Sequence, residues 1–282
     1  MNDILSQTLI RPARVEDSEA IAVLMREGVS DQVRRITIMG SSHLSRYVAD
    51  EIVGNNEDEY MVGTVRGLVV GMSSWRHTGT TLQLNHLYLA PEVRGQGLGT
   101  AFILDGLQRV RRPEEHQLAL DVFYDNPRAR AWYRSWGMSP EHHVLWIQVP
   151  LPPLDRQDTL SCAISGLAES DERHLRYGFS QFTLSTTVAT YQIGRLGDGL
   201  FRTGSGAILH DPAALQGLTC IDSQRQLLCA EPFEDDAEPI RRGATSVAES
   251  ERLVSSCATV VKHLESSLTR RPHILQAVPV RP

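Results

Sequence analysis

The residues best suited to chemistry belong to one glycine-rich turn, which reads Arg94-Gly95-Gln96-Gly97-Leu98-Gly99. Alternating apolar residues predict a strand over Leu82–Leu89 before the turn, and helical spacing predicts a helix over Leu98–Val110 after it. Glycine lets the backbone approach a ligand closely, and the N-terminus of a helix offers unpaired N–H groups to an anion. The turn therefore predicts a binding site for a pyrophosphate.

Several ligands carry a pyrophosphate, and the spacing of the turn ranks them. A Rossmann turn would need a third glycine at the position of Thr100. A Walker loop would need a lysine followed by serine or threonine, and the turn contains no lysine. The residues therefore favour coenzyme A over a dinucleotide, over a nucleoside triphosphate and over a plain tight turn.

Three segments together resemble the GNAT superfamily of N-acetyltransferases. Leu87–Gly99 resembles its motif A, whose pattern is Arg/Gln-x-x-Gly-x-Gly/Ala, and Asn126-x-x-Ala129-x-x-x-Tyr133 resembles its motif B. Ile10–Ala13, followed by Glu16 and Asp17, is similar to the first strand and helix of the family. The resemblance covers roughly Leu9 to Val149 and does not extend to the second half of the chain.

The resemblance implies acetyl-CoA as cofactor, with coenzyme A as product and no metal. It implies that the backbone at Leu87–Leu89 binds the pantetheine arm and polarises the thioester carbonyl. It also implies a role for Asn126 at the cofactor or the local turn, although a helix cap explains Asn126 almost as well. The residues expected to contact the cofactor are Leu87, Tyr88, Leu89, Arg94, Gly95, Gln96, Gly97, Leu98, Gly99, Thr100, Asn126 and Ala129.

Proton transfer requires an acid and a base. Tyr133 matches the general acid of the family, with helix packing beside Trp132 as the alternative. Related small-amine acetyltransferases often have acidic residues at the positions of Asn85 and His86, so His86, alone or through a water, becomes the candidate base. Alternation along a strand predicts that Asn85 and His86 point to opposite faces. A core histidine is the alternative for His86.

The flanking residues predict the elements that position these groups. The first half, residues 1–150, is expected to be an α/β fold with a mixed α+β sheet. In addition to the elements around the turn, the patterns predict a strand over Thr8–Arg14, a helix capped by Asp17, a helical segment over Ser42–Ile52, a hairpin of Tyr60–Val65 and Leu68–Arg76, a strand over Leu118–Phe123 and a helix over Asn126–Trp136. The family usually builds the acceptor pocket from the region equivalent to Val29–Tyr47. If they line it, Arg34, Arg35 and His43 would favour an acceptor with a carboxylate or phosphate.

Consecutive prolines at Leu151-Pro152-Pro153 predict a domain boundary near residue 150. Residues 151–282 are expected to form a smaller α+β accessory domain. Two interpretations stay open: a degenerate second GNAT-like unit, or a separate module that governs acceptor specificity or forms a homodimer. The patterns predict strands over Phe179–Leu184, Thr190–Ile193 and Leu218–Ala230, and a capping box at Ser246–Glu249 before a long helix through Leu268.

The composition excludes some classes of partner. A net charge of −6 over 282 residues gives no electrostatic support for a nucleic-acid partner. The four cysteines are isolated, which favours reduced thiols over disulfides or metal sites. Without a leader-like start or an apolar stretch of about 20 residues, we expect a cytoplasmic protein with no membrane partner.

The sequence thus predicts an N-acetyltransferase that moves an acetyl group from acetyl-CoA to a primary amine of a small molecule, directly within a ternary complex. Two alternatives stay open. One is acetylation of a protein N-terminus or lysine. The other, of a different class, is a sensor or scaffold that binds acyl-CoA without turnover, against which Tyr133 argues.

Overall fold

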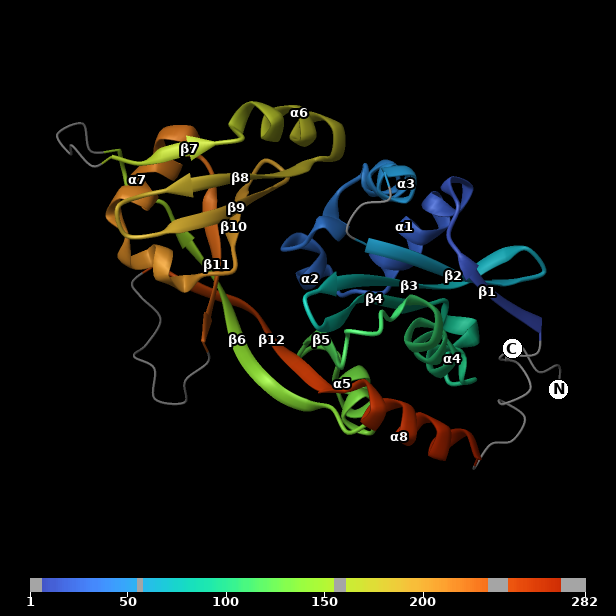
Figure 1. The fold of residues 1–282 in the computed structure, drawn as a ribbon. Coiled ribbons are helices and arrows are strands. Elements are labelled where there is room, and N and C mark those ends of the chain that lie inside the picture. The colour runs from blue at the N-terminus through green and yellow to red at the C-terminus, as the bar shows by residue number, and fades with distance from the viewer. Residues whose placement is uncertain (1–6, 55–57, 155–160, 233–242, 270–282) are drawn as a thin grey trace. The chain divides into compact units, whose positions relative to one another are not determined.

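The computed structural model describes residues 7–54, 58–154, 161–232 and 243–269 (Figure 1). The chain forms two compact units, and each unit draws on separate segments. Unit 1 consists of Met1–Val29, Ser45–Glu141 and Glu251–Pro282, and unit 2 of Ser30–Leu44 and His142–Ser250. Both units therefore include residues from each side of the boundary expected near residue 150.

Unit 1 is built on a mixed sheet. Its first five strands lie in sequence order, antiparallel from β1 to β4 and parallel between β4 and β5, and β12 follows β5. The expected α/β elements of the first half are present. They are β1 (Thr8–Pro12), α1 (Ser18–Glu27), α3 (Leu44–Gly54), β2 (Asp58–Val65), β3 (Leu68–Thr78), β4 (Thr81–Leu89), α4 (Leu98–Asp105), β5 (Gln117–Phe123), α5 (Pro127–Arg134) and β6 (Ser139–Pro150), the last running on into unit 2.

Local chemistry explains two early features of unit 1. Arg66 and Gly67 both have positive φ, 51° and 83°, which is the backbone of a two-residue hairpin turn, and the predicted β2–β3 hairpin is confirmed. The prediction that Asp17 caps α1 is wrong. The Asp17 carboxylate instead accepts from the backbone N–H of Arg14 at 2.8 Å and pairs with the Arg11 guanidinium, whose Nη2 lies 2.9 Å from Oδ1.

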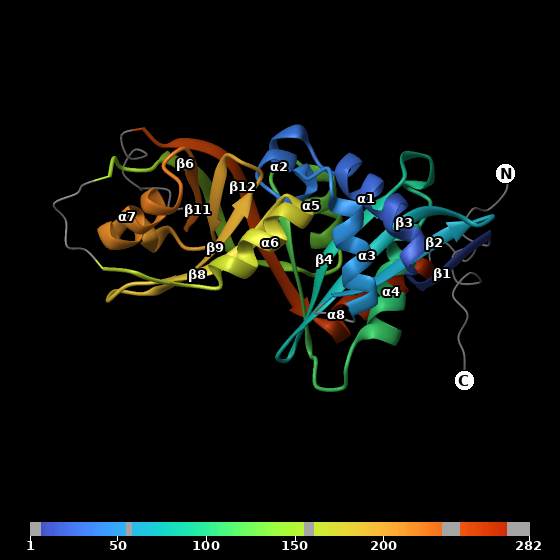
Figure 2. The ribbon, with the colours of Figure 1, turned by 90° about the horizontal axis from the view of Figure 1, so that it is seen from above.

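Helices cover both faces of this sheet (Figures 1 and 2). On one face a methyl group at Gly106, just after α4, would lie 2.1 Å from Cζ2 of the fully buried Trp75. On the other face a methyl group at Gly28, at the end of α1, would lie 2.1 Å from the Tyr88 ring. Glycine at both positions lets a helix approach the sheet closely.

A charged cluster secures the end of β3. His77 lies between two glutamates, with Nδ1 2.6 Å from Glu115 Oε1 and Nε2 3.0 Å from Glu59 Oε1. Glu115 is fully buried and also accepts from the backbone N–H of Arg112 at 2.8 Å. The cluster therefore joins the β2–β3 hairpin to the loop that leads into β5.

Unit 2 repeats the core order of unit 1. Its strands β7 to β11 lie in sequence order, β10 and β11 are parallel, and β6 pairs antiparallel with β11. A helix connects β10 and β11, as α4 connects β4 and β5. Its elements are α2 (Asp31–Arg35), β7 (Ala163–Ser165), α6 (Leu167–Tyr177), β8 (Phe179–Ser185), β9 (Thr190–Leu196), β10 (Leu200–Thr203), α7 (Pro212–Ile221), β11 (Gln226–Pro232) and the first part of β12 (Thr245–Ser256), which is followed in unit 1 by α8 (Cys257–Thr269).

Two predictions for the second half are wrong. Leu218 belongs to α7, because the Asp211 side chain caps this helix and Pro212 begins it, so the strand starts only at Gln226. Ser246–Glu249 forms no capping box, because these residues pair in the sheet as part of β12, and the helix begins at Cys257. The four cysteines are free. No helix among the described residues has the length and apolar character to cross a membrane.

Candidate active site

The glycine-rich turn has the backbone that its sequence predicts. Gly95 and Gly97 have φ of +77° and +91°, a region that residues with a side chain rarely adopt. Arg94 Nε donates to the Leu89 carbonyl at 2.9 Å, and Gln96 Nε2 donates to the Glu92 carbonyl at 2.7 Å. No side chain caps the N-terminus of α4. The turn is thus held by its own side chains, while the first turn of α4, Leu98 to Thr100, presents N–H groups that fit a pyrophosphate.

The start of α5 lies beside this turn. A methyl group at Gly99 would lie 2.6 Å from Cη2 of Trp132, so the two helices touch there. A methyl group at Gly95 would lie 3.7 Å from Nη2 of Arg128, which brings a guanidinium to the turn. Arg128 was not among the residues expected at the site, although its place within the motif B segment was a usable signal.

Strand β4 separates from β5 just before the predicted cofactor contacts. The parallel pairing runs from Thr81 opposite Gln117 to Leu84 opposite Leu120. Leu87, Tyr88 and Leu89 therefore lie beyond this ladder, while Leu87 to Leu89 stay paired with β3 on the other edge. Beyond Leu84, the edge of β4 on the side of β5 is unpaired by that strand, and the resemblance implies that the pantetheine arm binds along this edge.

A β-bulge changes the expected directions of Asn85 and His86. Trp75 pairs with Leu84 and Ser74 pairs with His86, so Asn85 is an extra residue in β4. The Asn85 side chain donates to both oxygens of Asp58, at 2.9 and 2.8 Å, and His86 interacts electrostatically with the same carboxylate. The prediction that the two side chains point to opposite faces is wrong, because the bulge interrupts the alternation.

Asp58 is a buried carboxylate that the sequence analysis missed. Its side chain is 5% exposed, and Arg76 Nε donates to its Oδ1 at 2.7 Å. Tyr60, two residues on, interacts electrostatically with Asp58, and with Tyr47 and Glu51 of α3. No sequence signal marked Asp58, because it sits at the start of an ordinary strand and gains its partners only when β3 pairs with β2 and β4 pairs with β3.

Four titratable side chains, Asp58, His86, Tyr88 and Tyr133, influence one another in succession. The rings of His86 and Tyr88 stack with centroids 5.8 Å apart, and the Tyr88 phenol interacts electrostatically with that of Tyr133. Burial lowers the pKa of His86 to about 4, against the opposing effect of Asp58. Burial raises the pKa of Tyr133 well above its usual value, and the pKa of Tyr88 likewise. At neutral pH the imidazole is therefore an unprotonated acceptor and the phenol a protonated donor.

Helix α5 fixes Tyr133 in place. The Asn126 side chain accepts from the backbone N–H of Ala129 at 3.1 Å, so it caps the helix, as the alternative interpretation held. Tyr133 is 9% exposed and packs edge-on against Trp136, with ring centroids 5.1 Å apart. Packing of the Tyr133 ring in the helix is therefore compatible with a role of its phenol as a proton donor.

The basic residues expected near the acceptor give no support for an anionic acceptor. Arg34, Arg35 and His43 all belong to the Ser30–Leu44 segment of unit 2. Arg34 Nη2 pairs with Asp31 Oδ1 at 3.1 Å on the same short helix. Its charge is therefore already matched by a neighbouring carboxylate.

Unit 2 has no comparable anion site at its equivalent helix. The N-terminus of α7 is occupied by Asp211, which is 1% exposed and accepts from the backbone N–H of Ala214 at 3.1 Å. Thr186 Oγ1 and Tyr191 Oη also donate to this carboxylate, at 2.5 and 3.1 Å. A buried negative charge at a helix N-terminus takes the place that a pyrophosphate would need.

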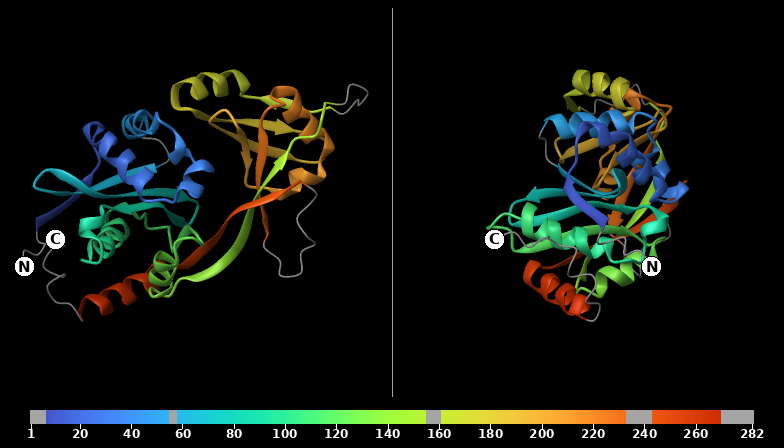
Figure 3. Two further views of the ribbon diagram at one scale, coloured as in Figure 1. Left: turned by 180° about the vertical axis from the view of Figure 1, so that it is seen from behind. Right: turned by 90° about the vertical axis from the view of Figure 1, so that its right-hand side faces the viewer.

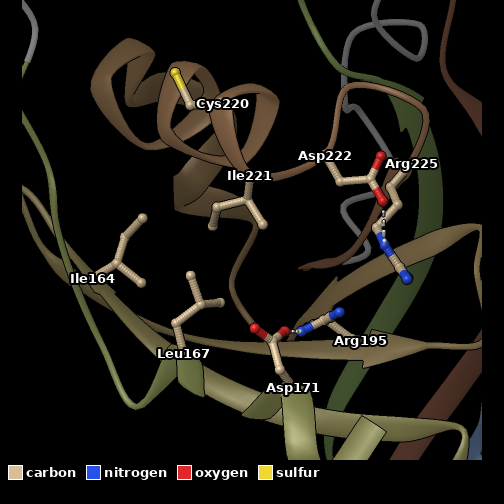
Figure 4. Close-up of a pocket in the computed structure, with 8 residues that line it drawn as sticks. All are labelled: Ile164, Leu167, Asp171, Arg195, Cys220, Ile221, Asp222 and Arg225. Atoms are coloured by element: carbon tan, nitrogen blue, oxygen red, sulfur yellow. Dashed lines mark hydrogen bonds and ion pairs between the residues drawn. The ribbon is translucent and has the colours of Figure 1, made fainter. Parts of the chain in front are cut away.

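Unit 2 does contain a cavity of about 400 Å³ (Figure 4). Two ion pairs lie at its wall, with Arg195 bound to Asp171 and Arg225 Nε 3.0 Å from Asp222 Oδ2. The rest of the lining is formed by Ile164, Leu167, Cys220 and Ile221. Each arginine is matched by its own carboxylate.

Comparisons with known proteins bear on the family and the fold. The model of the acetyltransferase (GNAT) family matches residues 29–138. No curated protein matches the chain. A tandem GNAT protein from the clavulanic acid biosynthesis pathway, solved without AcCoA, is similar in structure with a TM-score of 0.60 at 12% identity, over 89% of this chain and 98% of that one.

Two further solved structures are similar over most of the chain. A GCN5-related N-acetyltransferase from Sphaerobacter thermophilus has a TM-score of 0.59 at 14% identity, over 89% of this chain and 96% of that one. One from Kribbella flavida has a TM-score of 0.51 at 12% identity, over 90% and 72%. At these identities the likeness establishes a shared fold, which spans both units. The chain therefore contains an acetyl-CoA-dependent acetyltransferase domain of the GNAT family, which includes residues 29–138, within a tandem GNAT fold.

Proposed function

We propose that unit 1 transfers an acetyl group from acetyl-CoA to the primary amine of a small molecule, directly within a ternary complex. The observation that carries the proposal is the contact between the glycine turn and α5, the helix that holds Tyr133. A phenol is protonated at neutral pH, and burial lowers the pKa of His86 and raises that of Tyr133. Environments that push two titratable groups apart in this way are typical of an acid and a base in one reaction.

The cofactor supplies an acetyl thioester, and the chain supplies binding and proton transfer. The N-terminal N–H groups of α4, with Arg128 nearby, hold the pyrophosphate. The free edge of β4 at Leu87–Leu89 orients the arm and offers N–H groups to the carbonyl oxygen as it gains charge.

Two protons move in opposite senses. A primary amine has a pKa of about 10.4, so it must lose a proton before its nitrogen can attack. That first proton goes to solvent. The nitrogen becomes acidic as it bonds to the carbonyl carbon, and His86 then accepts its second proton, with the Asp58 carboxylate stabilising the imidazolium that forms. The nitrogen–carbon bond forms, the carbon–sulfur bond breaks, and Tyr133 donates its proton to the departing sulfur. The products are an amide and the thiol of coenzyme A. Proton exchange with solvent afterwards restores His86 and Tyr133.

The test is an amine panel monitored by thiol release, with purified wild type and Tyr133→Phe. The panel includes small primary amines and, for the protein alternative, peptides with a lysine or a free N-terminus. Each acid or base typically contributes 10²–10⁴-fold, so kcat for Tyr133→Phe should fall by about 10²-fold or more, with the acetyl-CoA Kd nearly unchanged. Tyr191→Phe is the matched control, since it removes a buried phenol in unit 2.

Each outcome separates the candidate functions. Turnover of small amines with little turnover of peptides supports the proposal, and the reverse favours a protein acetyltransferase. Binding of acetyl-CoA with no thiol release for any amine favours a sensor. Equal rates for wild type and Tyr133→Phe would contradict the acid role. The accessory role of the second half, a homodimer and a cytoplasmic location remain predictions.

A further inference from the structure

One buried carboxylate near the end of the chain binds the helix that carries Tyr133. Glu251 lies in the part of β12 that belongs to unit 1 and is 1% exposed. Its Oε1 accepts from Arg130 Nε and its Oε2 from Arg134 Nη2, both at 2.8 Å. Burial alone would raise the pKa of Glu251, but the two guanidiniums outweigh burial and lower it. Glu251 is therefore a charged group with both oxygens engaged by α5.

The two arginines lie four residues apart, so they project from the same side of α5. Tyr133 lies between them in sequence, one residue before Arg134. The Arg130 guanidinium also stacks 3.5 Å from the centroid of the Tyr124 ring, which precedes the helix. A single carboxylate thus binds one side of α5 at two points one turn apart.

The end of α5 has a second contact with the same C-terminal segment. Ser255 Oγ donates to the Gly137 carbonyl at 3.0 Å, and a methyl group at Gly137 would lie 2.9 Å from Thr259 Cγ2 of α8. The ribbons of α8 and α5 lie side by side (Figure 3). The segment that follows α5 is therefore held by β12 and α8. Trp132, on the other side, rests on Gly99 at the glycine turn.

The geometry points to Glu251 as a positioning residue for Tyr133, so that the last strand of the chain sets the place of the general acid. This inference rests on the proposed role of Tyr133. A reacting group displaced by about 1 Å can lose about 10²-fold in rate. Loss of the Glu251 charge leaves two neighbouring guanidiniums without their shared partner, and their repulsion moves the helix.

The test is a double-mutant cycle of Glu251→Gln and Tyr133→Phe, with kcat, KM and acetyl-CoA Kd measured for all four proteins. Glu251→Gln keeps the shape and removes the charge. In the wild-type background we expect kcat to fall by about 10 to 10²-fold, with Kd changed less than about threefold. In the Tyr133→Phe background we expect kcat to change less than about twofold, because the acid is already absent.

Asp121→Asn is the matched control, because it breaks the ion pair that Arg252, the residue after Glu251, makes with β5, Arg252 Nη1 to Asp121 Oδ2 at 3.2 Å. It should leave kcat unchanged. If Glu251→Gln fails to fold, Arg134→Met is used in the same cycle. The Arg134 side chain is 47% exposed, so its replacement disturbs the core little, and it removes one of the two contacts with Glu251.

The possible failures are distinguishable. An equal fall in both backgrounds, or no fall in either, would overturn the positioning role while leaving the proposed function intact. A Tyr133→Phe protein as fast as wild type would overturn the proposed acid itself, whatever Glu251→Gln does.

Discussion

Gly97→Ala tests whether the glycine turn holds the cofactor. Gly97 has φ of +91° at the N-terminus of α4. A residue with a side chain pays about 1–2 kcal/mol to keep a left-handed backbone. If the free protein relieves this strain by rearranging the turn, restoring the bound conformation costs the same amount. Such a cost corresponds to roughly a 5–30-fold weaker affinity. Calorimetric titration with coenzyme A measures the change directly.

Gly67→Ala is the matched control for this strain. Gly67 has φ of +83° in the β2–β3 hairpin, and an added methyl group would have nothing within 4 Å. It should therefore lower the free energy of unfolding by a similar amount and leave the coenzyme A affinity unchanged. A Gly97→Ala protein that binds coenzyme A as tightly as wild type would refute the assignment. Equal weakening by Gly67→Ala would show that the effect is global and not local to the turn.

Four other outcomes follow from named contacts. Asp58→Asn should lower kcat by about tenfold or more in the amine assay with the acetyl-CoA Kd unchanged, because the imidazolium at His86 loses its carboxylate. Gly106→Ala should lower the free energy of unfolding in urea by about 1–3 kcal/mol, because its methyl group would overlap Trp75; no change would mean that the ring can move. Burial lowers the pKa of His77, but its bonds to the two glutamates raise it above 6.5, so its stabilisation is full below pH 6.5 and is lost as the pH rises through the folded-state value. His77→Asn should therefore flatten the fall in stability above pH 6.5, and an unchanged slope would contradict this. Calorimetry should give one coenzyme A per chain, because Asp211 blocks the equivalent helix of unit 2; two would contradict that reading.

The elements around the turn could be predicted because their signals are local. Gly95 and Gly97 mark a backbone with positive φ, and Asn126-Pro127 marks a helix start through an N-cap followed by a proline. These signals act within a few residues, so no tertiary contact is needed to read them. They were sufficient to locate the cofactor turn and the Tyr133 helix, and thus the core of the candidate site.

The remaining parts of the site depend on contacts between distant segments. The bulge at Asn85 appears only when β4 pairs with β3, and it reverses the inference drawn from alternation. Asp58 acquires its role through Asn85 and Arg76, and Glu251 through arginines more than a hundred residues earlier. At Ser246–Glu249 the local capping pattern was overridden by sheet pairing, because a strand between two others gains more from its ladder than from a cap.

The order of the chain links the two units. Unit 1 takes β12 next to β5 and binds α5 through Glu251, yet both β12 and α8 follow unit 2 in the sequence. A chain that ended near residue 150 would lack the partner of Arg130 and Arg134 and the strand beside β5. The segment that completes unit 1 is therefore reached in the chain only through unit 2, whose own helix α7 has Asp211 at its N-terminus.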